Sequence, residues 1–310
     1  MKVYQPLEWT VTEAEDGWKL KDVLKRRLGL SRRLLARLKK TERGITVNGE
    51  RQHVGVQVFR GDVIAVYMEE EVSDGILPEP VPFEILYEDE HLLVVNKAPG
   101  IVVHPTRGHY TGTLANGVVH YWQRQGKRYR FRPVHRLDQD TSGVLVIAKN
   151  PYAHQSIAEQ MLNRQVKKQY AAVVHGVLQP AEGTVNAPID RDPEQPSLRI
   201  VMPEGKGYPA VTRYETVRQW KRAALVHVEP ETGRTHQIRV HMKHLGHPLV
   251  GDRMYGDPAK DDRLGASIAR HALHAEKLTF RHPLAREEVE FAAPLPEDML
   301  SLIHQLEKEP

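Results

Sequence analysis

Apolar residues that recur at helical spacing predict two short helices near the N-terminus. In KLKDVLKRRLGL (residues 19–30), the residues Leu20, Val23, Leu24 and Leu28 fall on one helical face, and Gly29 can end this helix in a left-handed conformation. Ser31 can cap a second helix, RRLLARLKK (residues 32–40), whose three leucines point inward. The outward positions of this second helix are almost all cationic, namely Arg32, Arg33, Arg37, Lys39 and Lys40.

The residues that follow predict strands, because their apolar positions are largely β-branched and are interrupted by turns. Asn48-Gly49 is a hairpin signal, and Gly61-Asp62 is a second turn ahead of VIAVYM (residues 63–68). We therefore expect residues 16–70 to form a small helix–helix–sheet domain, with residues 1–15 as an N-terminal extension. The acidic, proline-bearing residues 71–82 predict a solvated, extended linker.

A larger domain is predicted over residues 83–300, with residues 301–310 as a C-terminal tail. One helix is expected in NPYAHQSIAEQMLNR (residues 150–164), with Asn150 as its cap and a buried face that pairs Ile157 with Met161 and Ala158 with Leu162. Apolar runs predict the strands HLLVVNK, GVLVIAK, YAAVVHGV, AVTRYETV and ALVHVE. Many strands with few helices favour an α+β domain built on a mixed, largely antiparallel sheet.

Composition narrows the class of protein. A chain of 310 residues is long enough for two domains, and the absence of cysteine excludes disulfides, thiol nucleophiles and thiolate metal sites. The N-terminus has no apolar signal core, and nowhere do about 18 apolar residues run together as a membrane-spanning helix requires. We expect a cytoplasmic protein with no membrane partner.

The positive charge is concentrated in one segment. The chain as a whole has a formal net charge of +4, whereas residues 19–60 contain 13 Lys and Arg and 3 Asp and Glu, a local net charge of +10. Such a segment is typical of a surface that binds a polyanion, because each neutralised phosphate releases condensed counterions. Nucleic acid is therefore the expected partner, with a solvated basic helix face as the alternative.

The stretch VHRLDQDTSG (residues 134–143) holds the main candidate for catalysis, Asp138. Asp138 and Asp140 form an Asp-x-Asp pair, as in aspartyl-phosphate phosphotransferases, but there the nucleophile ends an apolar strand, whereas here the apolar strand follows. The stretch HMKHLGH places three histidines at intervals of three residues, but no H-E-x-x-H pattern or cysteine completes a zinc site. We therefore expect no metal.

Three stretches in order, HRLDQDTSG, KKQYAAVVHG (residues 167–176) and ETGRTHQIRVHMKHLGHPLVGDRMYG (residues 231–256), closely resemble the RluA/RluD-type family of RNA pseudouridine synthases. Together with further similar pieces, the resemblance covers about residues 83–295. It departs from the family at NKAPG, where proline more usually follows the lysine directly. The resemblance implies isomerisation of uridine to pseudouridine without a cofactor.

The same resemblance assigns roles to individual residues. It gives catalytic roles to Asp138, which acts near the ribose, to Tyr170, which stacks on the uracil, and to Arg239, which forms an ion pair with the aspartate. Further residues are expected to present the loop and the flipped nucleotide or to bind the substrate, namely His135, Arg136, Leu137 and Thr141.

Residues 16–70 resemble the S-four-like RNA-binding domain of a ribosomal small-subunit protein and several RNA-modifying enzymes, through LGLSRR, ITVNGERQ and VFRGDVI. The resemblance implies that the basic second helix binds RNA. We expect a monomer that acts on large-subunit ribosomal RNA. The alternatives are a transfer RNA substrate and a catalytically silent ribosome assembly factor.

Overall fold

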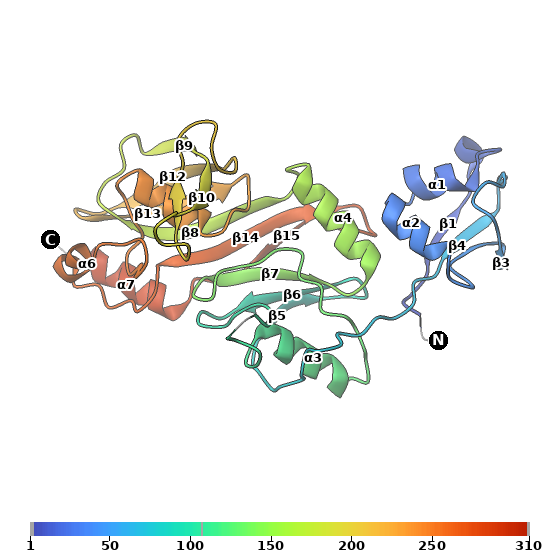
Figure 1. Cartoon of the computed structure of the whole chain (residues 1–310), viewed down its shortest axis with the longest axis horizontal. Helices are drawn as coiled ribbons and strands as arrows, with labels where there is room; N and C mark the ends of the chain where they lie inside the picture. Colours follow the sequence, from blue (N-terminus) through green and yellow to red (C-terminus); the bar gives the residue numbers. More distant parts are fainter. Residues whose placement is uncertain (1–2, 107, 309–310) are drawn as a thin grey trace.

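The computed structural model describes residues 3–106 and 108–308, in which a small N-terminal unit precedes a larger unit built on one long sheet (Figure 1). The small unit contains the 3-10 helix η1 (Glu13–Glu15) and the helices α1 (Leu20–Arg26) and α2 (Arg32–Leu38). Its described strands pair in the order β1-β4-β2-β3, with bounds β1 (Leu7–Thr10), β2 (Ile45–Val47), β3 (Glu50–Arg51) and β4 (Val63–Val66).

The local predictions for the small unit are confirmed. The Ser31 side chain accepts a hydrogen bond from the backbone N–H of Leu34 at 3.1 Å and so caps α2. The hairpin turn joins β2 to β3, and both of its residues, Asn48 and Gly49, have positive φ, as a two-residue turn of this kind requires. On α2, the three leucines are buried and the cationic residues are exposed.

We expected residues 1–15 to form a separate extension, but the described part of it, residues 3–15, belongs to the small unit. Strand β1 pairs antiparallel with β4, which makes it an edge of the small sheet. Tyr4, Leu7 and Val11 are buried in the same core as the leucines of α1 and α2. The apolar residues between Tyr4 and Val11 are too few to predict a strand from periodicity alone. A strand forms here because its backbone pairs with β4.

The linker is extended, but it is not simply solvated. The side-chain amide of Asn116 donates a hydrogen bond to the Leu77 carbonyl at 2.7 Å, and a Glu79 carboxylate oxygen accepts from the Gly112 N–H at 2.6 Å. The linker therefore packs against the start of α3 (Leu114–Arg124). Glu71 at its start forms an ion pair with Arg132 at 2.5 Å, within the larger unit.

The larger unit is α+β, as predicted, around a mixed and mostly antiparallel sheet. Its described strands run in the order β5-β6-β7-β14-β8-β13-β12-β9, and β15 also pairs with β14. Only the β7–β14 pair is parallel among these described strands. The bounds are β5 (Glu84–Glu88), β6 (Leu92–Lys97), β7 (Ser142–Ala148), β8 (Lys167–His175), β9 (Glu182–Asn186), β12 (Val211–Gln219), β13 (Ala223–Pro230), β14 (Leu273–Arg281) and β15 (Glu288–Ala292).

Strand β14 lies between two halves of this sheet (Figure 1). One half, β5-β6-β7, packs with α3 and α4 (Pro151–Leu162), and the other, β8-β13-β12-β9, packs with α5 (Gln237–His244). A separate two-stranded sheet of β10 (Ile189–Arg191) and β11 (Arg199–Val201) lies beside α5. Since β7 is parallel to β14 and β8 is antiparallel to it, the start of β7 lies across β14 from the middle of β8, where Ala171 and Tyr170 pair with His274 and Ala275.

Two further expectations about helices need correction. Asn150 caps α4 as predicted and Ile157 is buried, but Leu162 is 83% exposed, because the helix ends there and the chain turns away. Within the expected C-terminal tail, residues 301–307 are the second half of α7 (Glu297–Glu307), and residues 309–310 lie outside the described residues. Leu302, Ile303 and Leu306 of α7 pack with α6 (Pro258–Leu264) and β8 in one core, so the larger unit extends at least to residue 307. Among the described residues, no helix is both long and apolar enough to span a bilayer.

Candidate active site

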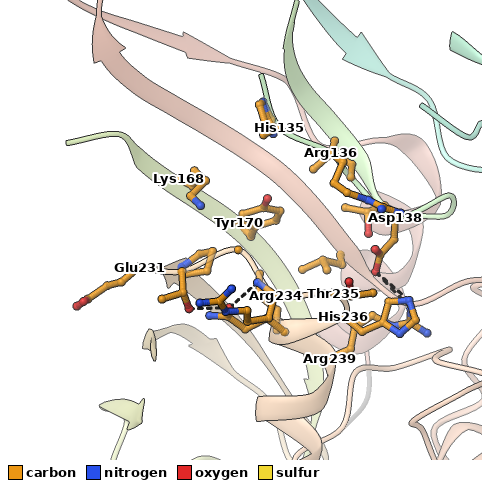
Figure 2. A pocket seen from close by; sticks show the side chains of 18 of the residues that line it. His135, Arg136, Asp138, Lys168, Tyr170, Glu231, Arg234, Thr235, His236 and Arg239 are labelled. Carbon is orange, nitrogen blue, oxygen red and sulfur yellow. Dashed lines mark hydrogen bonds and ion pairs between the residues drawn. The ribbon is translucent and has the colours of Figure 1, made fainter. Parts of the chain in front are cut away.

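A cavity of about 330 Å³ opens where the loop before β7, strand β8 and the turn before α5 converge. Its walls come mainly from residues 134–141, 168–170 and 230–239, with Met161 and Leu273. These are the three stretches that the sequence singled out, and they lie around one space (Figure 2). The fold therefore brings Asp138, Tyr170 and Arg239 together.

Asp138 faces a guanidinium group that is fixed from behind. Arg239 Nη1 donates to Asp138 Oδ2 at 3.3 Å, while Nε and Nη2 of Arg239 bind the two carboxylate oxygens of Asp252 at 2.7 and 2.8 Å. The Arg239 side chain is 5% exposed and that of Asp252 is fully buried, whereas Asp138 keeps 21% of its surface open to the cavity. Asp252 thus orients the guanidinium through a bidentate ion pair, and Asp138 binds the remaining nitrogen, Nη1.

The ionisation of this group of side chains follows from its burial and charges. Burial alone would raise the pKa of Asp252, but the Arg239 guanidinium outweighs it and holds that pKa below the ordinary value. Burial opposes the charge of Arg239, yet its contacts with Asp252 and the charge of Asp138 leave its pKa raised. A fixed positive charge therefore stays beside Asp138 throughout the physiological pH range.

An aromatic ring and a histidine complete this wall. The Arg239 guanidinium lies 4.9 Å from the centroid of the Tyr255 ring, within the range of a cation–π contact. His236 caps α5 with a φ of 57°, and its Nδ1 is 2.7 Å from the Tyr255 hydroxyl. Its Nε2 lies 4.0 Å from Asp138 Oδ2, and burial lowers the pKa of this histidine. Figure 2 shows Asp138 pointing toward His236 and Arg239.

The loop that carries Asp138 is anchored on both sides. The Thr141 hydroxyl is 2.8 Å from His271 Nε2, and Arg270 donates to the Asp140 carbonyl at 2.9 Å while it is held by an ion pair with Asp298. Thr141 is 2% exposed, so its hydroxyl is committed to His271. Thr141 therefore supports the loop rather than offering its hydroxyl to a substrate.

A buried lysine, Lys97, also holds the loop that carries Asp138 in place. The Lys97 ammonium donates to the carbonyls of Ala98, Ile101 and Gln139 at 2.8, 2.9 and 2.8 Å. Behind the loop, Gly143 has a φ of +114°, and a Cβ there would lie 2.1 Å from the Ala275 carbonyl oxygen, so only glycine fits where β7 joins β14. The position of Asp138 is thus set by the backbone as well as by Arg239.

Tyr170 forms the opposite wall. It lies on β8, and its hydroxyl has no hydrogen-bond partner among the described residues. Burial, and then the charge of Asp138, raise the pKa of Tyr170, so the hydroxyl is uncharged at neutral pH. Two residues before it on the same face of the strand lies Lys168, which also lines the cavity.

The other residues expected to bind substrate differ in how they face the cavity. Arg136 is exposed beside Asp138, and Leu137 is buried with 5% of its surface open. His135 Nε2 accepts from the Val146 N–H at 3.2 Å and so ties the loop to β7. Burial, and then the charge of Lys168, lower the pKa of His135 to about 3, so this histidine is neutral.

Comparison with known proteins shows which family has this site. A family model described as RNA pseudouridylate synthase matches residues 91–244. The uncharacterized RNA pseudouridine synthase YjbO of Bacillus subtilis is 46% identical over 277 residues, which make up 89% of this chain and 95% of that protein. The chain belongs to the RNA pseudouridine synthases. It is therefore an isomerase with an RNA substrate.

Other proteins similar to this RNA pseudouridine synthase carry names of the same family. Ribosomal large subunit pseudouridine synthase D of Xylella fastidiosa is 42% identical over 260 residues, covering 81% of this chain and 78% of that protein. The human RNA pseudouridylate synthase domain containing 4 structure matches with a TM-score of 0.59 at 29% identity, over 72% of this chain and 93% of that one. The similarity thus extends to the fold of the larger unit.

The residues considered for two other chemistries have other partners in the described structure. Asp138 lies ahead of β7 rather than at the end of a strand, and its carboxylate is paired with Arg239. His241 and His247 each have their own partner, the Ala187 carbonyl at 2.9 Å and the His175 carbonyl at 2.8 Å. Within residues 3–106 and 108–308, no three His, Cys, Asp or Glu side chains are arranged to hold a metal ion.

The cationic residues of α2 and of the turn that follows it lie outside this cavity, in the small unit. Four of them are exposed and form no ion pair with a described residue, namely Arg32, Arg33, Lys39 and Lys40. Arg37, in contrast, forms an ion pair with Glu71 of the linker, which also pairs with Arg132 of the larger unit. Arg37 thus joins the two units and is less available to RNA.

Sequence reasoning missed Asp252, His271, Lys97 and Lys168. Asp252 belongs to the quoted stretch GDRMYG, but its contact with Arg239 depends on the turn after α5 folding back against that helix. His271 approaches Thr141 only because β14 lies between β7 and β8. A signal was available for Lys168, because strand alternation places it on the same face as Tyr170.

Proposed function

We propose that this RNA pseudouridine synthase modifies large-subunit ribosomal RNA and that Asp138 acts on the ribose of the target uridine. The observation that carries the role of Asp138 is its ion pair with Arg239 at the wall of a cavity whose other wall is Tyr170. An open carboxylate, a fixed cation and an aromatic ring around one space are what this isomerisation requires.

The reaction breaks the bond between ribose C1′ and uracil N1 and then joins C1′ to uracil C5. Asp138 either attacks C1′ as a nucleophile or removes the neighbouring ribose proton as a base. Both routes need an ionised carboxylate beside an RNA backbone, and Arg239 keeps that charge compensated and oriented. Asp252 fixes the guanidinium, so it is a positioning residue in this scheme.

Tyr170 supports the base while it turns. Its ring offers a stacking face, and its unpartnered hydroxyl is free to take part in removing the proton from C5. A uridine in folded RNA must leave its stack to enter the cavity, and the exposed Arg136 next to Asp138 is suited to hold the flipped nucleotide. His135, Leu137 and Thr141 keep the loop in place around it.

The proposed RNA target rests on the relatives and on the charge of the small unit. Relatives of known target class are named ribosomal large subunit pseudouridine synthase D, as in Xylella fastidiosa and Escherichia coli. In the small unit, which resembles the S-four-like domain, α2 and the turn after it present four exposed cations that form no ion pair with a described residue, a surface suited to a large structured RNA. A ribosomal target also agrees with a monomeric enzyme acting in the cytoplasm.

The test is to map pseudouridines in the ribosomal and transfer RNA of cells with and without this gene, using a chemical tag that distinguishes the isomers. We expect one or more positions of large-subunit RNA to lose modification in the deletion and to regain it with the wild-type gene. Loss confined to transfer RNA would replace the proposed target. Recovery by the Asp138→Asn gene would support an assembly factor that needs no catalysis.

A further inference from the structure

Lys168 is a cation of the active-site cavity to which the scheme above gives no role. It lies on β8 two residues before Tyr170, and side chains two apart on a strand share one face about 6.7 Å apart. Both line the cavity (Figure 2). Gln169 between them faces the other side and donates to Glu276 at 2.8 Å.

Lys168 has no partner within the described part of the chain to compensate its charge. Among the described residues, its ammonium forms no hydrogen bond and lies within 4.0 Å of no carboxylate, and a Cβ on Gly233 would be 4.0 Å away. Glu231 also lines the cavity, but it is paired with Arg164 at 3.2 Å and Arg213 at 2.6 Å. Burial lowers the pKa of Lys168, with no nearby carboxylate to oppose it.

Two other cations of this cavity have partners, whereas Arg136, which also lines it, is exposed. Arg239 is paired with two carboxylates, and Arg234 donates to the Pro209 carbonyl at 3.1 Å and lies 5.5 Å from the Tyr208 ring. Keeping a half-buried ammonium charged without such contacts costs free energy while no substrate fills the cavity. A group of the substrate that carries or develops negative charge would offset that cost.

The order of side chains indicates which substrate group this is. In Figure 2, Tyr170 lies between Lys168 and Asp138. If Asp138 acts at the ribose and the uracil stacks on Tyr170, the base extends away from Asp138 toward Lys168. The substrate atoms that reach Lys168 are then those of the uracil edge, whose acceptors are carbonyl oxygens, and the phosphates lie on the ribose side.

We propose that Lys168 is a further catalytic residue, whose ammonium donates a hydrogen bond to a carbonyl oxygen of the uracil as the base leaves the ribose. When the C1′–N1 bond breaks, its electron pair stays with the uracil, and the negative charge spreads over N1 and the carbonyl oxygens. Lys168 stabilises this charge without transferring a proton, and the charge is neutralised when C5 bonds to C1′. The C5 proton then leaves and N1 takes up a proton, so no atom is gained or lost overall. A donor aimed at charge that develops in the transition state accelerates the step.

This inference rests on the proposed roles of Asp138 and Tyr170, and its experiment separates the two. Lys168→Met is compared with Lys167→Met, a matched control on the opposite, exposed face of β8. Conversion is measured in a single turnover at saturating RNA, and RNA affinity is measured at several salt concentrations. Asp138→Asn is measured in parallel on the same RNA.

We expect Lys168→Met to slow conversion by about 10²-fold or more. The RNA affinity and its salt dependence should stay as in wild type, because no phosphate contact is lost. Lys167→Met should behave as wild type. If Lys168 instead bound a backbone phosphate, the Met variant would bind more weakly with a shallower salt slope and convert saturating RNA at the normal rate. That result, or an unchanged rate and affinity, would overturn the inference, while inactivity of Asp138→Asn would leave the proposed function intact.

Lys168→Arg tests the charge if the Met variant does not fold. Because the ammonium must stay protonated, wild-type conversion should decline as the pH rises through the lowered pKa of Lys168. A guanidinium stays charged there, so the Arg variant should lose this alkaline decline while its absolute rate falls less than that of the Met variant. If Lys168→Arg kept the same alkaline decline as wild type, another group would cause the decline, and this role for the protonated Lys168 would be contradicted.

Discussion

Replacing Asp252 by asparagine removes the charge that holds Arg239 and keeps the shape of the side chain. Asp252 accepts from Nε and Nη2 of Arg239 at 2.7 and 2.8 Å, and from the N–H groups of Met254 and Tyr255 at 3.0 Å each. An amide can accept on one oxygen only, and its NH₂ group would face a donor of the guanidinium. The guanidinium would be left almost buried, with Asp138 at 3.3 Å as its carboxylate partner.

This geometry determines how much the free energy of unfolding should fall in Asp252→Asn. Removing one partner of a buried ion pair typically costs about 3–5 kcal/mol. Since Asp138 still faces Arg239 and the backbone N–H groups keep an oxygen to bind, we expect a value near the lower end, about 3 kcal/mol. Catalysis should fall as well, because a guanidinium that is no longer fixed from behind presents its charge to Asp138 less reliably.

Urea unfolding of Asp252→Asn and wild type measures this cost, with single-turnover conversion recorded on the same preparations. Asp262→Asn is the matched control, since Asp262 is exposed and forms no ion pair within the described residues. Its free energy of unfolding should change by less than about 0.5 kcal/mol. An equally small change for Asp252→Asn would refute the claim that the charge of Asp252 holds the guanidinium.

Three further outcomes are expected. Tyr170→Phe keeps the stacking ring but loses the free hydroxyl, so single-turnover conversion should fall about 10²-fold with RNA affinity unchanged; a normal rate would mean that stacking suffices. Because burial lowers the pKa of His271 to about 4, its neutral form is favoured in the folded protein, so the free energy of unfolding should fall by up to about 3 kcal/mol as the pH drops from about 6.5 to about 4. His271→Gln should flatten that part of the curve, and an unaltered curve would contradict the assignment. Changing Arg32, Arg33, Lys39 and Lys40 together to glutamine should reduce the salt slope of RNA binding by about 3, whereas Arg37→Gln should mainly weaken the junction with Glu71; an unchanged slope for the fourfold variant would exclude α2 as the RNA contact.

Signals carried by neighbouring residues were sufficient to predict many local elements of the fold. The Ser31 and Asn150 caps and the Asn48-Gly49 hairpin depend only on neighbouring residues, and all three are present. The end of the chain also carried a usable signal, because Met299, Leu302, Ile303 and Leu306 have helical spacing. This spacing is typical of a helix, so the expectation of a tail over residues 301–310 was wrong for residues 301–307, which belong to α7.

Contacts between distant segments could not be predicted in the same way. No local pattern indicates that β14 inserts between β7 and β8, although this order brings His271 to Thr141. The partnership of Asp138 with Arg239 was predicted from the family resemblance, and their 3.3 Å contact agrees with it. The contact of Asp252 with the other edge of the guanidinium depends on how the turn after α5 folds back, which one sequence does not encode as a pattern.

The role of Asp138 is tested most directly by single-turnover conversion of uridine-containing RNA by purified Asp138→Asn, with binding measured on the same RNA. An amide keeps the shape of the side chain but cannot serve as nucleophile or base. We predict that no pseudouridine forms while folding and RNA affinity stay close to those of wild type. Conversion at the wild-type rate would remove Asp138 from the mechanism, and loss of RNA binding would identify it as a structural residue of the loop.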